Sequence, residues 1–347
     1  MQAELQTLHA TIPATRNARS RWRSRTSVRL LLSDETGRIG IGEAAPLPDM
    51  STETAAAARD ALAHFDWPER APTSSAEIAR IVARIDPALP SARFAAETAL
   101  MGLWTWRLGV PLWAMWIDEV EPVRLASVLW GSNDAELVES AREAAAYEAS
   151  AVKVKVGRTP ALDDWLLETV RSYLPDAELR LDANGTLDPE ELDEHLERYA
   201  KYDPAFLEEP CALEEIEART SLPFPMAVDE SLGGPDGDAV FERALACKHV
   251  GAIVLKPTLL GGLARSHRMA HEAAAAGKSV VISHTMEGPI ARAACAHLAL
   301  ALGPTVAAGL GQHPGLLPLS DGLCTPWMDA KWIGTPQLPG LGLELRF

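Results

Sequence analysis

The sequence has few cysteines, and they are far apart. Its 347 residues include only four, Cys211, Cys247, Cys295 and Cys324. Thiols scattered in this way match neither a disulfide framework nor a zinc cluster, both of which need closely spaced cysteines. We therefore expect four structural thiols in a reducing compartment.

Long apolar runs and an excess of positive charge are also missing. No run approaches the roughly 18 apolar residues of a membrane span, and the start of the chain lacks the basic and apolar regions of a secretory signal. Lys and Arg number 32 against 48 Asp and Glu, a formal net charge of -16. This balance disfavours nucleic acid and anionic membranes as partners. The sequence predicts a soluble, cytoplasmic protein and leaves its oligomeric state open.

The first third of the chain reads as a mixed module. Its pattern predicts strands over residues 4–12, 26–33 and 38–43, followed by helices over 52–65, 74–85 and 91–108. A small antiparallel sheet beside helices is an α+β arrangement. The 47% of hydrophobic residues is ample for a core, and the length suits a barrel of roughly 200–250 residues plus this module.

A densely cationic segment, Arg16–Arg25, lies inside this module of an acidic protein. We interpret it as a loop with two possible roles. It is either a solvated connection or a lid whose guanidinium groups, such as that of Arg19, bind a carboxylate-bearing ligand. The sequence alone does not separate the two.

Beyond about residue 122, short apolar runs recur every twenty-odd residues, with helical intervals between most of them. The runs cover 123–130, 151–157, 178–182, 205–208, 226–229, 252–256, 279–283 and 305–309. Parallel strands with helical crossovers predict a closed β/α barrel. No Gly-x-Gly-x-x-Gly fingerprint follows any strand, which disfavours an open dinucleotide-binding sheet.

Polar residues recur at the carboxyl ends of these runs, where a barrel carries its active site. Those on six successive runs are Lys153, Lys155, Asp182, Asn184, Glu208, Glu209, Asp229, Glu230, Lys256 and Ser283. A charged residue at one strand end is commonly structural. Six adjacent strands with the same feature indicate a functional site.

Three of these carboxylates, Asp182, Glu208 and Asp229, come from successive strands and should converge. Carboxylates this close would have raised pKa values unless a cation lay among them. An all-oxygen set favours Mg²⁺, with Mn²⁺ as the alternative, over zinc. Glu209 and Glu230 directly follow two of the ligands, so strand alternation predicts that they point elsewhere.

Three lysines flank the predicted metal. The spacing of Lys153 and Lys155 points both ammonium groups into the barrel, and Lys256 lies across from them. Burial, the dication and the neighbouring ammonium group should each depress a lysine pKa, which would make a general base near neutral pH. With a metal to stabilise an oxyanion, these residues could remove a proton α to a carboxylate.

At these residues the chain resembles the enolase superfamily, and within it the muconate lactonizing enzyme subgroup. The resemblance implies a (β/α)₇β barrel over residues 119–320 and an α+β capping domain over residues 1–118. It also implies that a C-terminal tail, about 321–347, packs back on the cap. The matching motifs are Lys153-Val154-Lys155, Asp182-Ala183-Asn184, Glu208-Glu209-Pro210, Asp229-Glu230-Ser231 and Lys256.

Within that subgroup the chain most resembles the o-succinylbenzoate synthases of menaquinone biosynthesis. These lyases remove water from the dicarboxylate 2-succinyl-6-hydroxy-2,4-cyclohexadiene-1-carboxylate through a metal-bound enediolate. The resemblance implies that Lys155 is the base, that Lys256 stabilises the enediolate and that Lys153 tunes Lys155. It also implies that Gly261 and Gly262 let backbone amides approach the succinyl carboxylate, and that Asn184 and Ser283 contact substrate.

One loop departs from the family pattern. These synthases usually carry Ser-Ser-x-x-Glu-Ser after the seventh strand, whereas the sequence here is Ser283-His284-Thr285-Met286-Glu287-Gly288. The eighth-strand region lacks the Asp-x-Asp of dipeptide epimerases, which lowers but does not remove that alternative. An N-succinylamino acid racemase, a muconate cycloisomerase and an inactive barrel scaffold also remain open.

Overall fold

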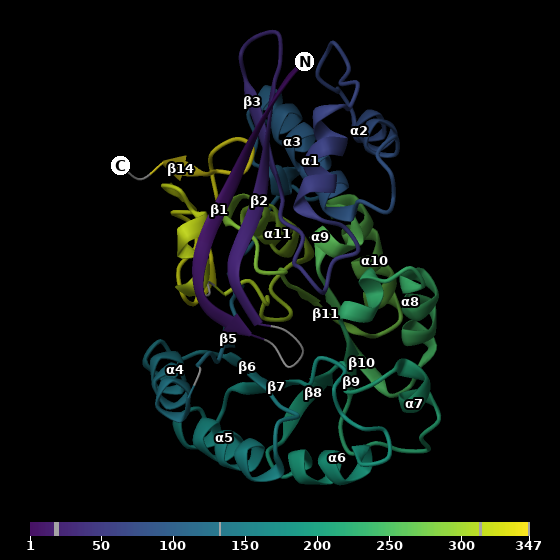
Figure 1. Cartoon of the computed structure of the whole chain (residues 1–347), viewed down its shortest axis with the longest axis vertical. Helices are drawn as coiled ribbons and strands as arrows, with labels where there is room; N and C mark the ends of the chain where they lie inside the picture. Colours follow the sequence, from purple (N-terminus) through teal and green to yellow (C-terminus); the bar gives the residue numbers. More distant parts are fainter. Residues whose placement is uncertain (17–20, 132, 312–313, 346–347) are drawn as a thin grey trace.

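The computed structural model describes the chain except for residues 17–20, 132, 312–313 and 346–347. Its first part is an antiparallel sheet in the order β1-β2-β3 with helices packed against it (Figure 1). The elements are β1 (Gln2–Arg16), β2 (Arg21–Ser33), β3 (Ile39–Ala44), α1 (Ala55–Ala63), α2 (Ser75–Val82) and α3 (Pro90–Leu108). This is the predicted capping domain.

Close packing of α3 against β3 determines where glycine is needed in this sheet. A Cβ on Gly40 would collide with the backbone of Ala99, and one on Gly42 with that of Ala95. The hairpin before β3 is fixed by Asp34, whose carboxylate accepts hydrogen bonds from the amides of Thr36 and Arg38 at 2.8 and 3.0 Å. The local sequence therefore sets both the turn and the approach of the helix.

Within the cationic segment Arg16–Arg25, the residues that the structure describes belong to strands. Arg16 ends β1, and Arg21 to Arg25 belong to β2. The Arg25 guanidinium is buried and donates to the carbonyls of Pro46 at 2.8 Å and Ala45 at 2.7 Å. The interpretation of the whole segment as a loop is therefore wrong, because Arg25 is held by main-chain oxygens. Arg19 lies outside the described residues, so its predicted ligand contact stays a prediction.

The second part is a parallel sheet of seven strands that curls into a barrel, in the order β11-β10-β9-β8-β7-β6-β5. The barrel closes through isolated bridges from Leu125 to Ala308 and from Ser283 to Gly309. The strands are β5 (Ser127–Val128), β6 (Ala151–Lys155), β7 (Glu178–Asp182), β8 (Pro204–Glu208), β9 (Met226–Val228), β10 (Val250–Leu255) and β11 (Ser279–Ile282).

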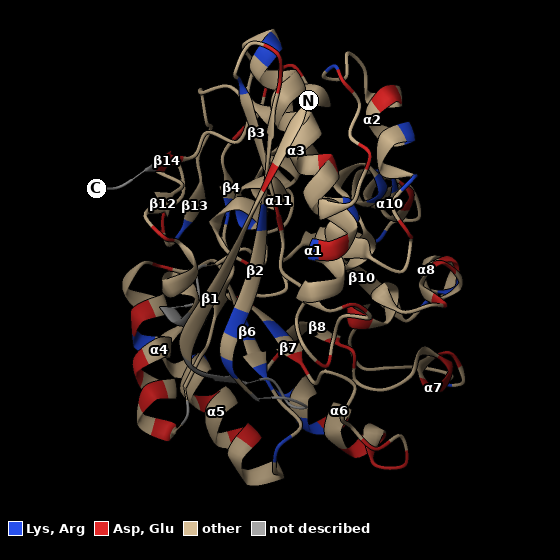
Figure 2. Ribbon diagram, turned by 45° about the horizontal axis from the view of Figure 1, so that its top comes forward, with Lys and Arg blue, Asp and Glu red and all other residues tan. Residues whose placement is uncertain are grey.

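The helices of the barrel lie close to the predicted intervals. They are α4 (Asp134–Ala146), α5 (Pro160–Tyr173), α6 (Leu192–Ala200), α7 (Leu213–Glu217), α8 (Gly237–Ala246), α9 (Pro257–Leu260), α10 (Leu263–Ala275) and α11 (Pro289–Leu302). Acidic residues are prominent on outer helices such as α4 and α5, and basic residues lie on β6 (Figure 2). No helix in the described part of the chain has the length and apolarity to cross a membrane.

The predicted first and eighth barrel strands differ most from the structure. Residues 123–130 divide into β4 (Val123–Arg124) and β5, because β4 pairs with β13 (Trp332–Ile333) near the end of the chain. Residues 305–309 contribute only bridges. The sequence could not show this, since the tail supplies a competing partner for the first strand.

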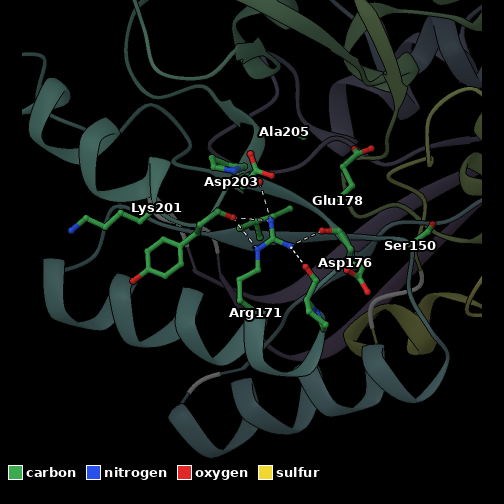
Figure 3. Close-up of a pocket in the computed structure, with 12 residues that line it drawn as sticks. Ser150, Arg171, Asp176, Glu178, Lys201, Asp203 and Ala205 are labelled. Carbon is green, nitrogen blue, oxygen red and sulfur yellow. Dashed lines mark hydrogen bonds between the residues drawn. The ribbon is translucent and has the colours of Figure 1, made fainter.

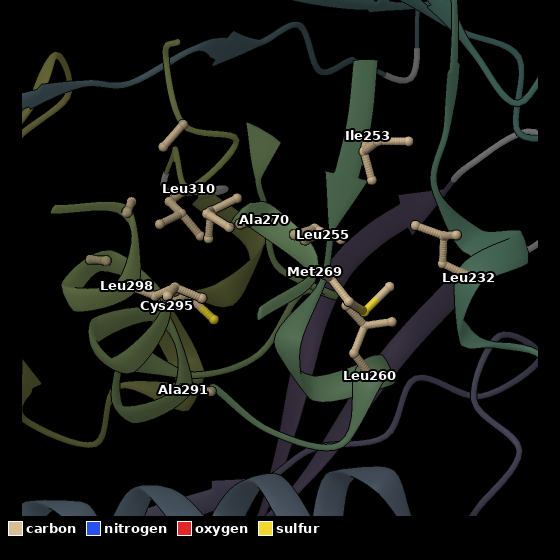
Figure 4. Close-up of a cluster of buried hydrophobic side chains, with 14 of the residues drawn as sticks. Leu232, Ile253, Leu255, Leu260, Met269, Ala270, Ala291, Cys295, Leu298 and Leu310 are labelled. Atoms are coloured by element: carbon tan, nitrogen blue, oxygen red, sulfur yellow. The ribbon is translucent and has the colours of Figure 1, made fainter. Parts of the chain in front are cut away.

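Side chains alternate between the inside and the outside of the barrel. Phe206, Ala227, Ala252, Val254 and Val281 form a small apolar cluster of their own, and each lies two or four residues before a predicted site residue. Val152 and Val154, which alternate with the lysines, by contrast join the main core. That core includes side chains of β10, α10 and α11 (Figure 4).

The C-terminal residues return to the start of the barrel and to the cap. Gly340 accepts a hydrogen bond from the Leu112 amide at 2.8 Å, and the Trp113 indole donates to the Pro336 carbonyl at 3.2 Å. The Asp321 carboxylate lies 3.1 Å from Arg29 of β2. Two short strands, β12 (Leu323–Cys324) and β14 (Glu344–Leu345), pair within this tail.

Candidate active site

The carboxyl ends of β6 to β10 bring the predicted lysines and carboxylates together. Parallel register places Lys155 beside Asp182, and Asp182 beside Glu208, on adjacent strands. Asp229 and Lys256 directly follow β9 and β10. Because side chains of paired residues project from the same face of a sheet, the residues form one layer across the barrel mouth.

Each lysine contacts a different set of partners. The Lys153 ammonium lies 3.0 Å from Asp182 Oδ2 and also contacts the Glu208 carboxylate. Lys155 donates to Asn184 Oδ1 at 2.8 Å and lies 3.5 Å from Asp182 Oδ2. The two members of the Lys-x-Lys pair are therefore not equivalent: Lys153 faces two carboxylates, and Lys155 leans toward a neutral amide.

On the other side of the mouth, Lys256 pairs with consecutive acidic residues. Its ammonium lies 2.7 Å from Asp229 Oδ2 and 3.0 Å from Glu230 Oε1. Asn184 Nδ2 donates to the same Glu230 oxygen at 3.2 Å. Glu230 therefore points into the site. The prediction that it points elsewhere is wrong, because the strand ends at Val228 and the chain turns into the 3₁₀ segment Glu230–Gly233.

The electrostatics of the cluster favour charged groups in spite of burial. Burial alone would lower the pKa of Lys153, but Asp182 and Glu208 outweigh it and raise that pKa well above its ordinary value. Burial likewise opposes the charge on Lys256, but Asp229 and Glu230 raise its pKa. These carboxylates thus raise the pKa of both lysines when no cation binds among them, and the predicted depression, which included a dication, stays a prediction.

The carboxylates respond in different ways. Burial works to raise the pKa of Asp182, yet Lys153 and Lys155 hold it well below its usual value. The pKa of Asp229 is raised well above its ordinary value, first by burial and then by the charge of Glu230. At Asp229, burial and the charge of Glu230 thus outweigh the effect of Lys256 and Lys153.

The donor set suits a hard divalent cation. Asp182, Glu208, Asp229 and Glu230 supply four carboxylates against three ammonium groups in contact with them. Asp229 Oδ1 and Glu230 Oε2 are buried with no hydrogen-bond partner in the described chain. Buried oxygens without partners, in an all-oxygen cluster with net negative charge, match the chemistry of Mg²⁺.

In this structure the carboxylates are nonetheless paired with lysines and do not form a ready set of metal ligands. Among the described residues, no three acidic, His or Cys side chains are already grouped as metal ligands. Lysine and metal compete for the same oxygens, so binding would require Asp182, Glu208 and Asp229 to give up part of their lysine contacts. The metal site therefore stays a prediction, which the chemistry of the donors supports.

Comparisons with known proteins identify the fold family. A family model described as enolase C-terminal domain-like matches residues 136–347. The o-succinylbenzoate synthase of Proteus mirabilis (strain HI4320) is 32% identical over 323 residues, with 89% of each chain covered. That of Yersinia pseudotuberculosis serotype I is 34% identical over 322 residues, again with 89% coverage of each chain. The chain belongs to the enolase superfamily.

Solved structures agree over the whole chain. A dipeptide epimerase from Methylococcus capsulatus, complexed with Mg and the dipeptide L-Arg-D-Lys, has a TM-score of 0.85 at 26% identity and covers 99% of this chain and 98% of its own. Muconate lactonizing enzyme from Pseudomonas putida has a TM-score of 0.80 at 23% identity, with 99% and 96% covered. The predicted barrel with a capping domain, and the muconate lactonizing enzyme subgroup, are confirmed.

Gly261 and Gly262 lie after the sixth strand of this superfamily barrel, but their amides are already engaged. Both donate to the Pro257 carbonyl, Gly262 at 3.0 Å. The next amide, that of Leu263, donates to the buried Glu97 carboxylate of the capping domain. In this structure the predicted contact of these amides with a substrate carboxylate is therefore not available.

The loop after the seventh strand is held from several sides. Ser283 Oγ donates to the Gly309 carbonyl at 3.1 Å. His284 Nδ1 accepts from the Met286 amide at 3.0 Å, and the Glu287 carboxylate accepts from Thr258 and Thr285. These bonds give His284 a role in fixing the loop. The predicted substrate contact of Ser283 stays a prediction.

Glu97 and Arg180 are among the buried charged residues that sequence reasoning missed. Glu97 was not singled out because its partner amide lies 166 residues away. Arg180 lies inside the barrel, 1% exposed, where its guanidinium contacts Glu178 at 2.6 Å and the Ala307 carbonyl at 2.8 Å. Arg180 lies two residues before Asp182 in the same strand, and residues two apart in a strand face the same side. This spacing could have predicted that Arg180 points into the barrel.

A cavity of about 610 Å³ lies at the opposite, amino end of the barrel strands (Figure 3). Arg171 lies beside it and donates to the carbonyls of Tyr202 at 2.8 Å, Asp203 at 2.9 Å and Ala177 at 2.7 Å. Lys201 extends away from that guanidinium. Main-chain oxygens satisfy the Arg171 charge. The guanidinium therefore ties together the turns that follow α5 and α6, and it is not available for a reaction.

Proposed function

We propose that the protein is an o-succinylbenzoate synthase that acts in menaquinone biosynthesis. The observation that carries the proposal is the placement of two lysines, Lys155 and Lys256, on different sides of one carboxylate cluster. The curated relatives named o-succinylbenzoate synthase support the choice of substrate, since they cover 89% of this chain.

Lys155 is the proposed base. Its nitrogen lies 2.8 Å from the neutral amide oxygen of Asn184 and 3.5 Å from the carboxylate of Asp182. Of the two lysines on this strand, Lys155 therefore has the weaker contacts with carboxylates. It would take the proton α to the ring carboxylate, and that proton and the ring hydroxyl leave together as water. Lys153, fixed between Asp182 and Glu208, would set the position and field around it.

Lys256 has the properties of a permanent cation. Its carboxylate partners raise its pKa, which keeps the ammonium charged at neutral pH. A fixed positive charge that faces the developing enediolate stabilises it without itself exchanging a proton. Mg²⁺, held by Asp182, Glu208 and Asp229, would supply the additional positive charge that an enediolate oxygen requires.

A second candidate is the racemisation or epimerisation of N-succinylamino acids or dipeptides. Two lysines on different sides of the site could remove a proton from one face and return it to the other. Solved relatives named N-succinyl Arg/Lys racemase and dipeptide epimerase have TM-scores of 0.86 and 0.85. The sequence after residue 307, Ala308-Gly309-Leu310-Gly311, offers no Asp-x-Asp for a substrate amine, so we place dehydration first.

The test is a direct assay of product formation. Purified protein is incubated with 2-succinyl-6-hydroxy-2,4-cyclohexadiene-1-carboxylate, with Mg²⁺, with Mn²⁺, or with a chelator. We expect o-succinylbenzoate with either metal and none with the chelator. If no product forms with Mg²⁺ or Mn²⁺ while N-succinylamino acids exchange their α proton in deuterated water, the racemase is the correct assignment.

A further inference from the structure

A chain of hydrogen bonds crosses the barrel mouth between the two lysines. Lys155 donates to Asn184 Oδ1 at 2.8 Å, and Asn184 Nδ2 donates to Glu230 Oε1 at 3.2 Å. The same Glu230 oxygen accepts from Lys256 at 3.0 Å. Asn184 and Glu230 thus connect the proposed base to the proposed cation.

Unusual backbone geometry brings both bridging residues into this position. Asn184 has a positive φ of 48°, in the left-handed region that asparagine tolerates better than most residues. Asp229 has φ -140° and ψ -94°, and Glu230 begins a 3₁₀ turn directly after it. A continued strand would have pointed Asp229 and Glu230 to opposite faces. The turn instead lets both reach Lys256.

The two partners of Lys256 are not interchangeable. Asp229 belongs to the predicted metal ligands, and a carboxylate that binds a cation loses much of its hold on a neighbouring ammonium group. Glu230 Oε1 already accepts from Asn184 and Lys256, so this oxygen orients side chains whether or not Oε2 contacts a cation. Lys256 would therefore keep Glu230 as its partner when Asp229 turns toward the metal.

We propose that Glu230, through Asn184, is a positioning residue that fixes the separation and direction of Lys155 and Lys256 on the two sides of the substrate. This inference rests on the proposed function. Misplacement of a reacting group by about 1 Å can cost about 100-fold in rate. Loss of the bridge should therefore lower kcat far more than it weakens substrate binding.

The test compares Glu230→Gln with Asn184→Leu and with the control Asp176→Asn, which changes an acidic residue at the amino end of the barrel. We expect Glu230→Gln and Asn184→Leu each to lower kcat about 10- to 100-fold, with KM changed less than about threefold. Glu230→Asp, which keeps the charge, should restore part of the rate. The bridge is wrong if kcat is unchanged, or if KM rises as much as kcat falls.

Two measurements that do not depend on turnover accompany the kinetics. Titration calorimetry should give similar Mg²⁺ affinity for the wild type and Glu230→Gln, and a loss of tenfold or more would make Glu230 a metal ligand instead. A crystal structure of the wild type with Mg²⁺ should keep Lys256 within hydrogen-bond distance of Glu230. If the wild type makes no o-succinylbenzoate, the proposed function fails, and this structure still decides whether the bridge exists.

Discussion

The two ends of the barrel hold their charges in different ways. At the amino end, Arg171 is surrounded by main-chain carbonyls of the turns that follow α5 and α6. At the carboxyl end, Lys153, Lys155 and Lys256 are held by carboxylates and by one amide side chain. Main-chain partners cannot move without unfolding a turn, whereas side-chain partners can exchange.

This difference in partners distinguishes the structural charge of Arg171 from the proposed reactive charges of the lysines. In the described chain Arg171 donates to main-chain carbonyls, and the guanidinium therefore stabilises the fold in one arrangement. The carboxyl-end cluster keeps buried oxygens of Asp229 and Glu230 without partners in the described chain, which is costly unless another ligand uses them. The cavity lies at the amino end, whereas the proposed chemistry lies at the carboxyl end.

The largest expected effect is at the proposed base. Lys155→Ala should lower kcat at least about 1,000-fold, because general-base catalysis commonly contributes 100- to 10,000-fold. Mg²⁺ affinity should change little, since none of the predicted ligands is removed. Steady-state kinetics and calorimetry measure the two quantities. A variant that retains near-wild-type kcat would rule out Lys155 as the base.

Asp229→Asn should weaken metal binding and turnover together. The substitution keeps the shape of the side chain but removes the charge that a hard cation prefers, and we expect a loss of about 100-fold in Mg²⁺ affinity. A rise in Mg²⁺ concentration should recover part of the rate. Unchanged affinity would remove Asp229 from the ligand set.

At the amino end, Arg171→Ala should affect stability and leave the chemistry alone. Loss of the guanidinium would leave several main-chain carbonyls without a hydrogen-bond donor. Buried groups left without partners cost about 1–3 kcal/mol of stability. Urea unfolding should show the loss, while kcat and KM stay as in the wild type. Lys201→Ala, at the exposed rim of the same cavity, is the matched control and should change neither. A fall in kcat for Arg171→Ala would break the distinction between the two ends.

Glu97 tests a carboxylate that is held by main-chain amides. Burial raises its pKa to about 7, while the amides of Leu263 and Ala264 and the charge of Arg93 work in the opposite direction. A raised pKa means that the folded state binds the proton more tightly than the unfolded state. The contribution of Glu97 to stability is therefore greatest below about pH 4.5 and declines as the pH rises through about 7.

Replacement by a neutral isostere should remove this dependence. Between pH 4.5 and pH 8, the free energy of unfolding of Glu97→Gln should rise relative to that of the wild type by on the order of 2 kcal/mol. Urea unfolding at a series of pH values measures it. A difference between the two proteins that is constant with pH would show that Glu97 is ionised throughout.

The sequence predicted the parts of the molecule that depend on local periodicity. The alternation of Val152 and Val154 with the lysines placed the ammonium groups inside, and the helices began and ended near the predicted residues. The prediction failed where distant partners decide. Arg25 belongs to a strand because its backbone pairs with Ala10 of β1, and Glu230 enters the site because a 3₁₀ turn interrupts the alternation.

The most direct test of the account is the ratio of two activities in one preparation. The value of kcat/KM is measured for dehydration of the cyclohexadiene substrate and for racemisation of N-succinylamino acids, in wild type and in Lys155→Ala, with Mg²⁺ present. We predict that dehydration is the faster reaction and that Lys155→Ala abolishes both. Racemisation without dehydration, or dehydration that survives the loss of Lys155, would contradict it.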